Sequence, residues 1–137
     1  MSGEIEHAVW QAWKDTKSDI LVIEGQGSLM NPAYPGGYEI LAAARPDIII
    51  LQHAPARKEY DGFPGYPIHP LSKQIDALHF VSSKPVVAVT INHENMDTDN
   101  VKTYSAMLQQ TLGIPAMDVL LHGADDLARL VASYIKN

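Results

Sequence analysis

Hydrophobic positions along the chain follow two spacings, one typical of helices and one typical of buried strands. Residues 5, 8, 9, 12 and 13 repeat at helical spacing, which predicts an amphipathic N-terminal helix that Ser2 is positioned to cap. Short continuous apolar runs, such as 20–23 and 48–51, are typical of strands buried on both faces of a parallel sheet. The predicted strands are 19–24, 47–52, 85–91 and 117–121, and the further predicted helices are 38–44, 70–81, 98–112 and 125–135.

Helices that lie between strands imply right-handed crossovers and a parallel sheet. We therefore expect one α/β domain over residues 1–137, a three-layer αβα arrangement with a mostly parallel sheet of about four strands. The alternation of helix and strand begins in mid-pattern. Such a start leaves a strand edge or an apolar face uncovered, and it favours a homo-oligomer or a missing covering segment.

Composition and charge narrow the class of protein. The hydrophobic fraction of 46% and the charged fraction of 19% are typical of globular proteins. A net charge of −6 argues against a nucleic-acid partner, and the absence of cysteine excludes disulfides, thiolate nucleophiles and zinc–sulfur sites. Neither a membrane span nor a signal peptide is recognisable, so we expect a cytoplasmic protein with no membrane partner.

The most informative local feature is the junction between the apolar run 20–23 and the stretch Glu24-Gly25-Gln26-Gly27-Ser28. A strand over 19–24 would deliver the Glu24 carboxylate to the carboxyl edge of the sheet, where open α/β folds bind ligands. There Glu24 would hold Mg²⁺ or accept a proton, or else only shape the turn. The glycines let backbone N–H groups approach a substrate or anion closely. Ser28 is better explained as a turn hydroxyl than as a nucleophile.

Two loops are longer than a compact α/β domain needs, and both leave the carboxyl ends of predicted strands. The first carries Tyr34, and the second, 53–69, carries His53, Arg57 and Tyr66. Arg57 would clamp a carboxylate or phosphate, and the tyrosines would form walls for a ligand or only pack the prolines. His53, His93 and His122 each follow a predicted strand, so they could form an acid–base pair or a metal site at that edge.

The sequence contains no GxxxxGK[ST] phosphate loop. It nevertheless resembles the carboxyl-terminal portion of a P-loop family long labelled a domain of unknown function, which includes D-glutamate N-acetyltransferases. The resemblance covers essentially the whole chain and rests on Ser2-Gly3-Glu4-Ile5-Glu6, Glu24-Gly25-Gln26-Gly27-Ser28-Leu29 with Pro32, Tyr34 and Gly36, Pro46-Asp47, His53-x-Pro55-x-Arg57, and Gly62-x-Pro64-x-Tyr66-Pro67-Ile68.

The resemblance implies a fold like that of dethiobiotin synthetase, preceded by another α/β domain. Glu24 would be the metal-linked or catalytic acid, Glu24 or His53 would take a proton from an attacking amine, and Arg57 would hold a substrate carboxylate. Substrate contacts are predicted for Gly25, Gln26, Gly27, Ser28, Tyr34, Arg57 and Tyr66. Because the phosphate-loop strand, its lysine and the preceding domain are missing from these residues, we expect a piece of a longer protein, inactive alone, or else a stand-alone relative.

The expected reaction is acyl transfer from acetyl-CoA to a small acidic amino acid. Two alternatives belong to other classes of protein. One is an ATP-dependent ligase or kinase-like enzyme that uses ATP and Mg²⁺, and the other is a non-catalytic binding or assembly module.

Overall fold

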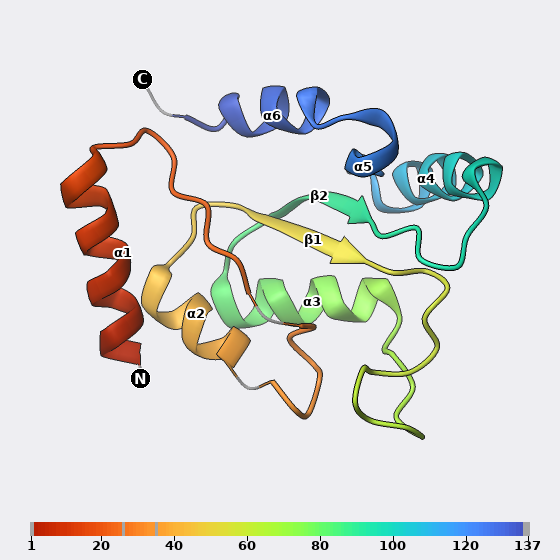
Figure 1. Ribbon diagram of the computed structural model, residues 1–137, viewed down its shortest axis with the longest axis horizontal. Coiled ribbons are helices and arrows are strands. Elements are labelled where there is room, and N and C mark those ends of the chain that lie inside the picture. Colours follow the sequence, from red (N-terminus) through yellow and green to blue (C-terminus); the bar gives the residue numbers. More distant parts are fainter. Residues whose placement is uncertain (1, 26, 35, 136–137) are drawn as a thin grey trace.

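The structure is a computed structural model that describes residues 2–25, 27–34 and 36–135 (Figure 1). Its helices and strands alternate along the chain as an α/β fold. In chain order they are α1 (Ser2–Thr16), α2 (Gly36–Ala44), β1 (Ile49–His53), α3 (Leu71–Ser82), β2 (Val86–Ile91), α4 (Thr98–Leu112), β3 (Ala116–Met117), α5 (Val119–His122) and α6 (Asp125–Ala132).

The sheet is parallel, in the order β1-β2-β3. His53 pairs with Ile91 across the first two strands, and Val89 pairs with Ala116 across the second two. Helices α2 and α3 lie on one side of the sheet and α4, α5 and α6 on the other, while α1 stands at one end (Figure 1). The predicted α/β class with a parallel sheet is therefore confirmed.

The core surrounds the central strand β2. Val89, Ile91 and Val101 are almost completely buried and pack with Leu71, Leu108 and Ala116. Helix α4 ends where the sequence predicts, because Gly113 adopts the left-handed conformation that closes a helix and donates its N–H to Gln109 O. Helix α3 begins directly after Pro70, one residue later than predicted.

The predicted strand over 19–24 is wrong. These residues form no strand and make no backbone hydrogen bond within the part of the chain that the structure describes. A strand needs a neighbour to satisfy its N–H and C=O groups, and without one the segment stays solvated. The side chain of Val22 is consequently 90% exposed, and Glu24 is exposed as well.

The expected burial of 48–51 on both faces is also wrong, because burial alternates along β1 and the less covered face leaves Ile50 exposed. The predicted strand over 117–121 ends early, at Met117. Asp118 accepts hydrogen bonds from the backbone N–H groups of Leu120 and Leu121, and this cap turns the chain into α5. Within residues 2–25, 27–34 and 36–135, three strands form rather than about four. No helix within the described ranges has the length and apolar character that a bilayer crossing requires.

Candidate functional site

The carboxyl ends of the three strands bring several polar side chains to one edge of the sheet. His53 ends β1, His93 and Glu94 follow β2, and Asp118 follows β3. A hydrogen bond joins the carboxyl ends of β1 and β2, because Asn92 donates its backbone N–H to His53 O at 2.8 Å. This edge is where parallel α/β sheets bind their ligands.

The turn after β2 is held by local hydrogen bonds. The backbone N–H of Glu94 donates to Asn92 Oδ1 at 3.0 Å, and that of Met96 donates to His93 O at 2.9 Å. Asn95 sits in the left-handed region with φ 60°, which asparagine tolerates better than most residues. The backbone that carries His93 and Glu94 is therefore fixed by its own sequence.

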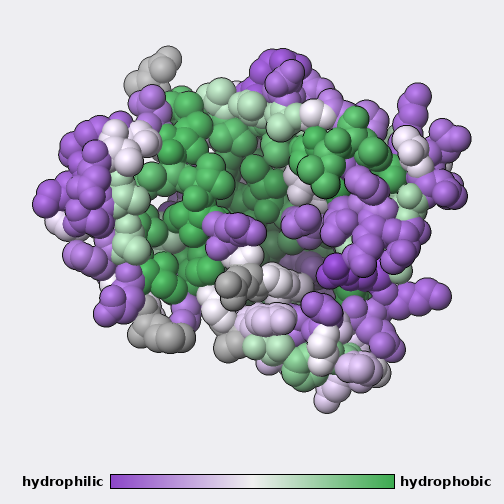
Figure 2. Space-filling view, in the orientation of Figure 1, coloured by the Kyte–Doolittle hydropathy of each residue, from purple (hydrophilic) through white to green (hydrophobic). Residues whose placement is uncertain are grey.

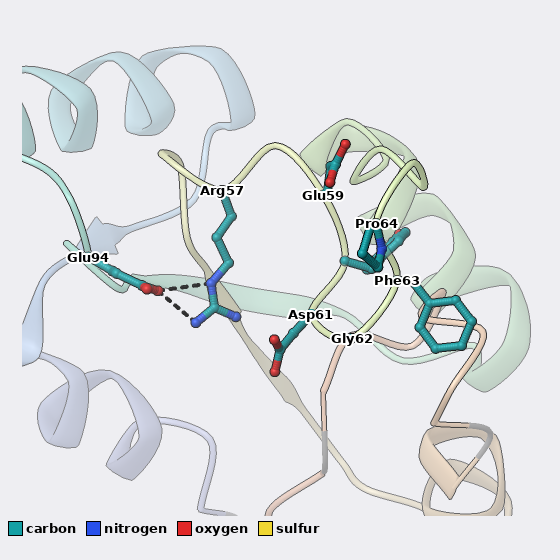
Figure 3. Close-up of a pocket in the computed structure, with 8 residues that line it drawn as sticks. Arg57, Glu59, Asp61, Gly62, Phe63, Pro64 and Glu94 are labelled. Atoms are coloured by element: carbon teal, nitrogen blue, oxygen red, sulfur yellow. Dashed lines mark hydrogen bonds and ion pairs between the residues drawn. The ribbon is translucent and has the colours of Figure 1, made fainter.

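Arg57 crosses from the long loop after β1 to the turn after β2. Its Nε and Nη2 both donate to Glu94 Oε2, at 2.9 and 2.6 Å (Figure 3). Both side chains are partly exposed, so the pair contributes little to stability. Its importance is geometric, because the guanidinium already presents two donors to a carboxylate.

The ion pair borders a pocket of about 300 Å³. The pocket is lined by Arg57, Glu59, Tyr60, Asp61, Gly62, Phe63, Pro64 and Glu94 (Figure 3). Three carboxylates and one guanidinium face this space, a combination suited to a ligand that carries both an amine and a carboxylate. The loop that forms it is braced, because Glu59 and Pro67 make an antiparallel bridge and Tyr60 donates its N–H to Tyr66 O at 3.0 Å.

A second, more apolar pocket of about 540 Å³ shares the Tyr60 ring with the first. Its lining is Met30, Pro32, Tyr60, Tyr66, Pro67, Ile68, His69 and Pro70. Tyr60 is buried between the two pockets, and its hydroxyl lies 2.8 Å from His69 Nδ1. Tyr66, which the sequence predicts as a ligand contact, lines this second space.

His53 lies against Tyr104 of α4. Its Nε2 is 3.2 Å from the Tyr104 hydroxyl, and the two rings stack. Burial lowers the pKa of His53 and raises the pKa of Tyr104, because the charged form of each group is poorly solvated there. The imidazole is therefore neutral and the phenol protonated at physiological pH.

His93 makes a polar contact between the ends of β2 and β3. Its Nδ1 lies 2.5 Å from Asp118 Oδ2, and the Asp118 side chain has no exposed surface. His93 was one of three strand-end histidines in the sequence, but Asp118 lay hidden inside a predicted strand. Glu94 was missed as well, although its position beside His93 after β2 was a usable signal.

The predicted stretch 24–28 contributes none of its described residues to the pockets at this edge. Glu24 and Gly25 are exposed, and neither pocket described above is lined by Glu24, Gly25, Gly27 or Ser28. Gly27 adopts φ 67° against the Tyr34 ring, where an added Cβ would come within 2.8 Å of Tyr34 Cδ2.

The Ser28 hydroxyl donates to Gln74 Oε1 at 3.2 Å, which fits a turn-holding role. Gln26 lies outside the described residues. Within the described ranges no group of three His, Asp or Glu side chains is placed to hold a metal ion, so Mg²⁺ at Glu24 stays a prediction.

Comparison with known proteins gives relatives that are longer than this chain. The chain is 28% identical to a D-glutamate N-acetyltransferase from Tritonibacter scottomollicae, over 97% of the chain and 41% of that protein. It is also 28% identical to a D-glutamate N-acetyltransferase from a Pseudoalteromonas species, over 77% of the chain and 34% of that protein. The chain thus spans less than half the length of these relatives.

A solved structure has the same fold. The crystal structure of a DUF1611 family protein from Anabaena variabilis superposes with a TM-score of 0.86 at 29% identity, covering 96% of this chain and 40% of that one. The family model described as "Domain of unknown function (DUF1611_C) P-loop domain" matches residues 1–128. The chain therefore belongs to the DUF1611_C P-loop domain family.

Proposed function

We propose that this chain forms part of an N-acyltransferase that moves an acetyl group from acetyl-CoA to the amine of a small acidic amino acid such as D-glutamate. The observation that carries the proposal is the Arg57–Glu94 pair at the rim of the charged pocket. Arg57 already directs two N–H donors at a carboxylate oxygen, so a substrate carboxylate can take the place of Glu94. The names of the longer relatives support the same reaction class.

The charges of the pocket match the other end of such a substrate. Glu59 and Asp61 line the same space as Arg57, and their carboxylates attract an ammonium group. The amine must lose a proton before it attacks a thioester carbonyl, so the reaction needs a base. Of the two acceptors predicted from the sequence, His53 is neutral at this edge, whereas Glu24 lies on an exposed segment.

The proposal assigns no nucleotide site to these 137 residues. A phosphate loop needs a glycine-rich turn that ends in Lys followed by Ser or Thr, and the 137 residues contain none. The residues at the strand ends are acidic or imidazole groups rather than the lysine of such a loop.

The test is thiol release from acetyl-CoA in the presence of D-glutamate, using the protein as its gene encodes it. Loss of a charge-assisted contact to a carboxylate is expected to raise the KM for D-glutamate about tenfold to a hundredfold in Arg57→Ala. Lys58→Ala, which removes the neighbouring exposed charge, is the matched control and should leave KM unchanged. An unmodified protein that releases no CoA, or an Arg57→Ala variant with an unchanged KM, would contradict the proposal.

A further inference from the structure

Asp118 is held in place from two directions. Its Oδ1 accepts the backbone N–H groups of Leu120 and Leu121 at 3.0 and 3.1 Å, and its Oδ2 faces His93 Nδ1 at 2.5 Å. The side chain is completely buried, so water does not compete for these contacts. A buried carboxylate that faces three donors is fixed in position.

This contact determines which nitrogen of His93 carries the proton. An ionised carboxylate only accepts hydrogen bonds, so His93 Nδ1 must donate, and the lone pair of the neutral ring then lies on Nε2. Among the described residues the side chain of His93 makes its hydrogen bond through Nδ1, and it is 35% exposed. Asp118 therefore leaves the basic Nε2 of a partly exposed ring without a hydrogen-bond partner among the described residues.

His93 is next in sequence to a residue of the charged pocket, and its own side chain does not line that pocket. His93 precedes Glu94 in the rigid turn after β2, and Glu94 is the residue that Arg57 binds at the pocket rim. Of the three strand-end histidines, His53 has its Nε2 engaged by the Tyr104 hydroxyl, and His122, at the end of α5, has its Nδ1 3.3 Å from Asp118 O. His93 is the one whose Nδ1 faces a buried carboxylate.

We propose that His93 is the general base of the site and that Asp118 is its positioning residue; this inference rests on the proposed acyl transfer. The substrate nitrogen forms a bond to the acyl carbon of a thioester, and the carbon–sulfur bond breaks. The proton on that nitrogen passes to His93 Nε2, and the imidazolium then gives it to the departing thiolate. The Asp118 carboxylate stabilises the imidazolium between these two transfers.

The orientation of the ring can be tested without any substrate. Two-dimensional ¹⁵N NMR of the histidine rings should show His93 of the neutral protein with its proton on Nδ1. Asp118→Asn should remove this preference, whereas a merely structural Asp118 would leave the His93 tautomer unchanged. A neutral His93 ring protonated on Nε2 in the unmodified protein would overturn the proposal.

Kinetics test whether the base is used. His93→Asn keeps an amide N–H near the position of Nδ1 and removes Nε2, so Asp118 retains its partner. In thiol release with D-glutamate this variant should lose about a hundredfold in kcat, with KM changed little. His79→Asn on α3 is the control and should keep full kcat. A His93→Asn variant that keeps its kcat would overturn the proposal. A simultaneous loss of kcat in His53→Asn would indicate that His53 is the base instead.

A failure of the acyl-transfer proposal gives a different result. If the unmodified protein releases no CoA, the readout becomes carbethoxylation of histidines by diethyl pyrocarbonate, followed by peptide mass analysis. A base with a free Nε2 should make His93 react faster than His53, and Asp118→Asn should slow His93 selectively. Equal rates at His93 and His53, together with no effect of Asp118→Asn, would overturn the assignment of His93 as a base.

Discussion

At the carboxyl end of β1, the His53 imidazole is partly buried against the Tyr104 ring and hydroxyl. Burial lowers the pKa of His53 below its ordinary value of 6.5, so the folded state resists protonation of this ring. The unfolded chain has no such resistance. The difference links one residue to the pH dependence of stability.

We expect the free energy of unfolding to fall as pH drops below about 6.5, because the unfolded state then binds a proton that the folded state does not. The fall should end below the folded pKa of His53, and this contribution should be flat above 6.5. Urea unfolding between about pH 5 and pH 7.5 measures it.

The matched variants for that series are His53→Gln and His79→Gln. His53→Gln should flatten the acidic part of the profile, whereas His79→Gln, on the surface of α3, should reproduce the profile of the unmodified protein. A His53→Gln profile parallel to that of the unmodified protein would show that His53 does not carry the effect.

Local patterns in the sequence predicted part of the candidate site. His53 and Arg57 were found because a β run is followed by a long loop, which is a local pattern. Glu94 and Asp118 act through partners 37 and 25 residues away, and no local spacing encodes such contacts. Tyr66 lines the second pocket and Tyr34 packs on Gly27, while ligand contact by either residue stays a prediction.

At the scale of elements, local caps explain which boundaries could be predicted. Helix α4 coincides with its predicted range because Gly113 stops it, and α5 was missed because the Asp118 cap overrides the apolar run after it. The strand over 19–24 failed for the opposite reason. Its formation depends on a neighbouring strand, which the residues of the segment themselves do not specify.

Gly113→Ala should lower the free energy of unfolding by about 1 kcal/mol. Gly113 has φ 69° and nothing within 4 Å of an added Cβ, so the cost comes from backbone conformation rather than from a clash. Gly25→Ala is the control, because that glycine also faces open space without a positive φ, and it should change stability by less than about 0.5 kcal/mol. Equal losses in urea unfolding would refute the backbone explanation.

At the scale of the whole molecule, one face carries a broad apolar area (Figure 2). Figure 2 shows apolar side chains around a hollow in the region where the segment after α1 passes between α1 and β1 in Figure 1. Val22 is 90% exposed, and Trp10 and Trp13 of α1 are each about half exposed. Apolar areas of this kind mark association surfaces, so we expect another copy or further polypeptide to cover this face.

Val22→Lys should reduce self-association of the chain with little effect on folding, because this side chain has almost no contacts to lose. Sedimentation velocity over a range of protein concentrations measures the change. Phe80→Lys, which replaces a side chain of similar exposure on α3, is the control and should sediment like the unmodified chain. If Phe80→Lys abolishes association and Val22→Lys does not, the apolar area around residue 22 is not the surface responsible.

The Arg57–Glu94 pair has one more consequence. The Glu94 carboxylate competes with any incoming carboxylate for the Arg57 guanidinium, because Glu94 is always at high local concentration. In the proposed acyl transfer, the affinity for an incoming acid would be the difference between two similar contacts, so we expect weak binding and fast departure of the product. Glu94→Gln removes the competing carboxylate, so it should tighten ligand binding, whereas Arg57→Ala should weaken it.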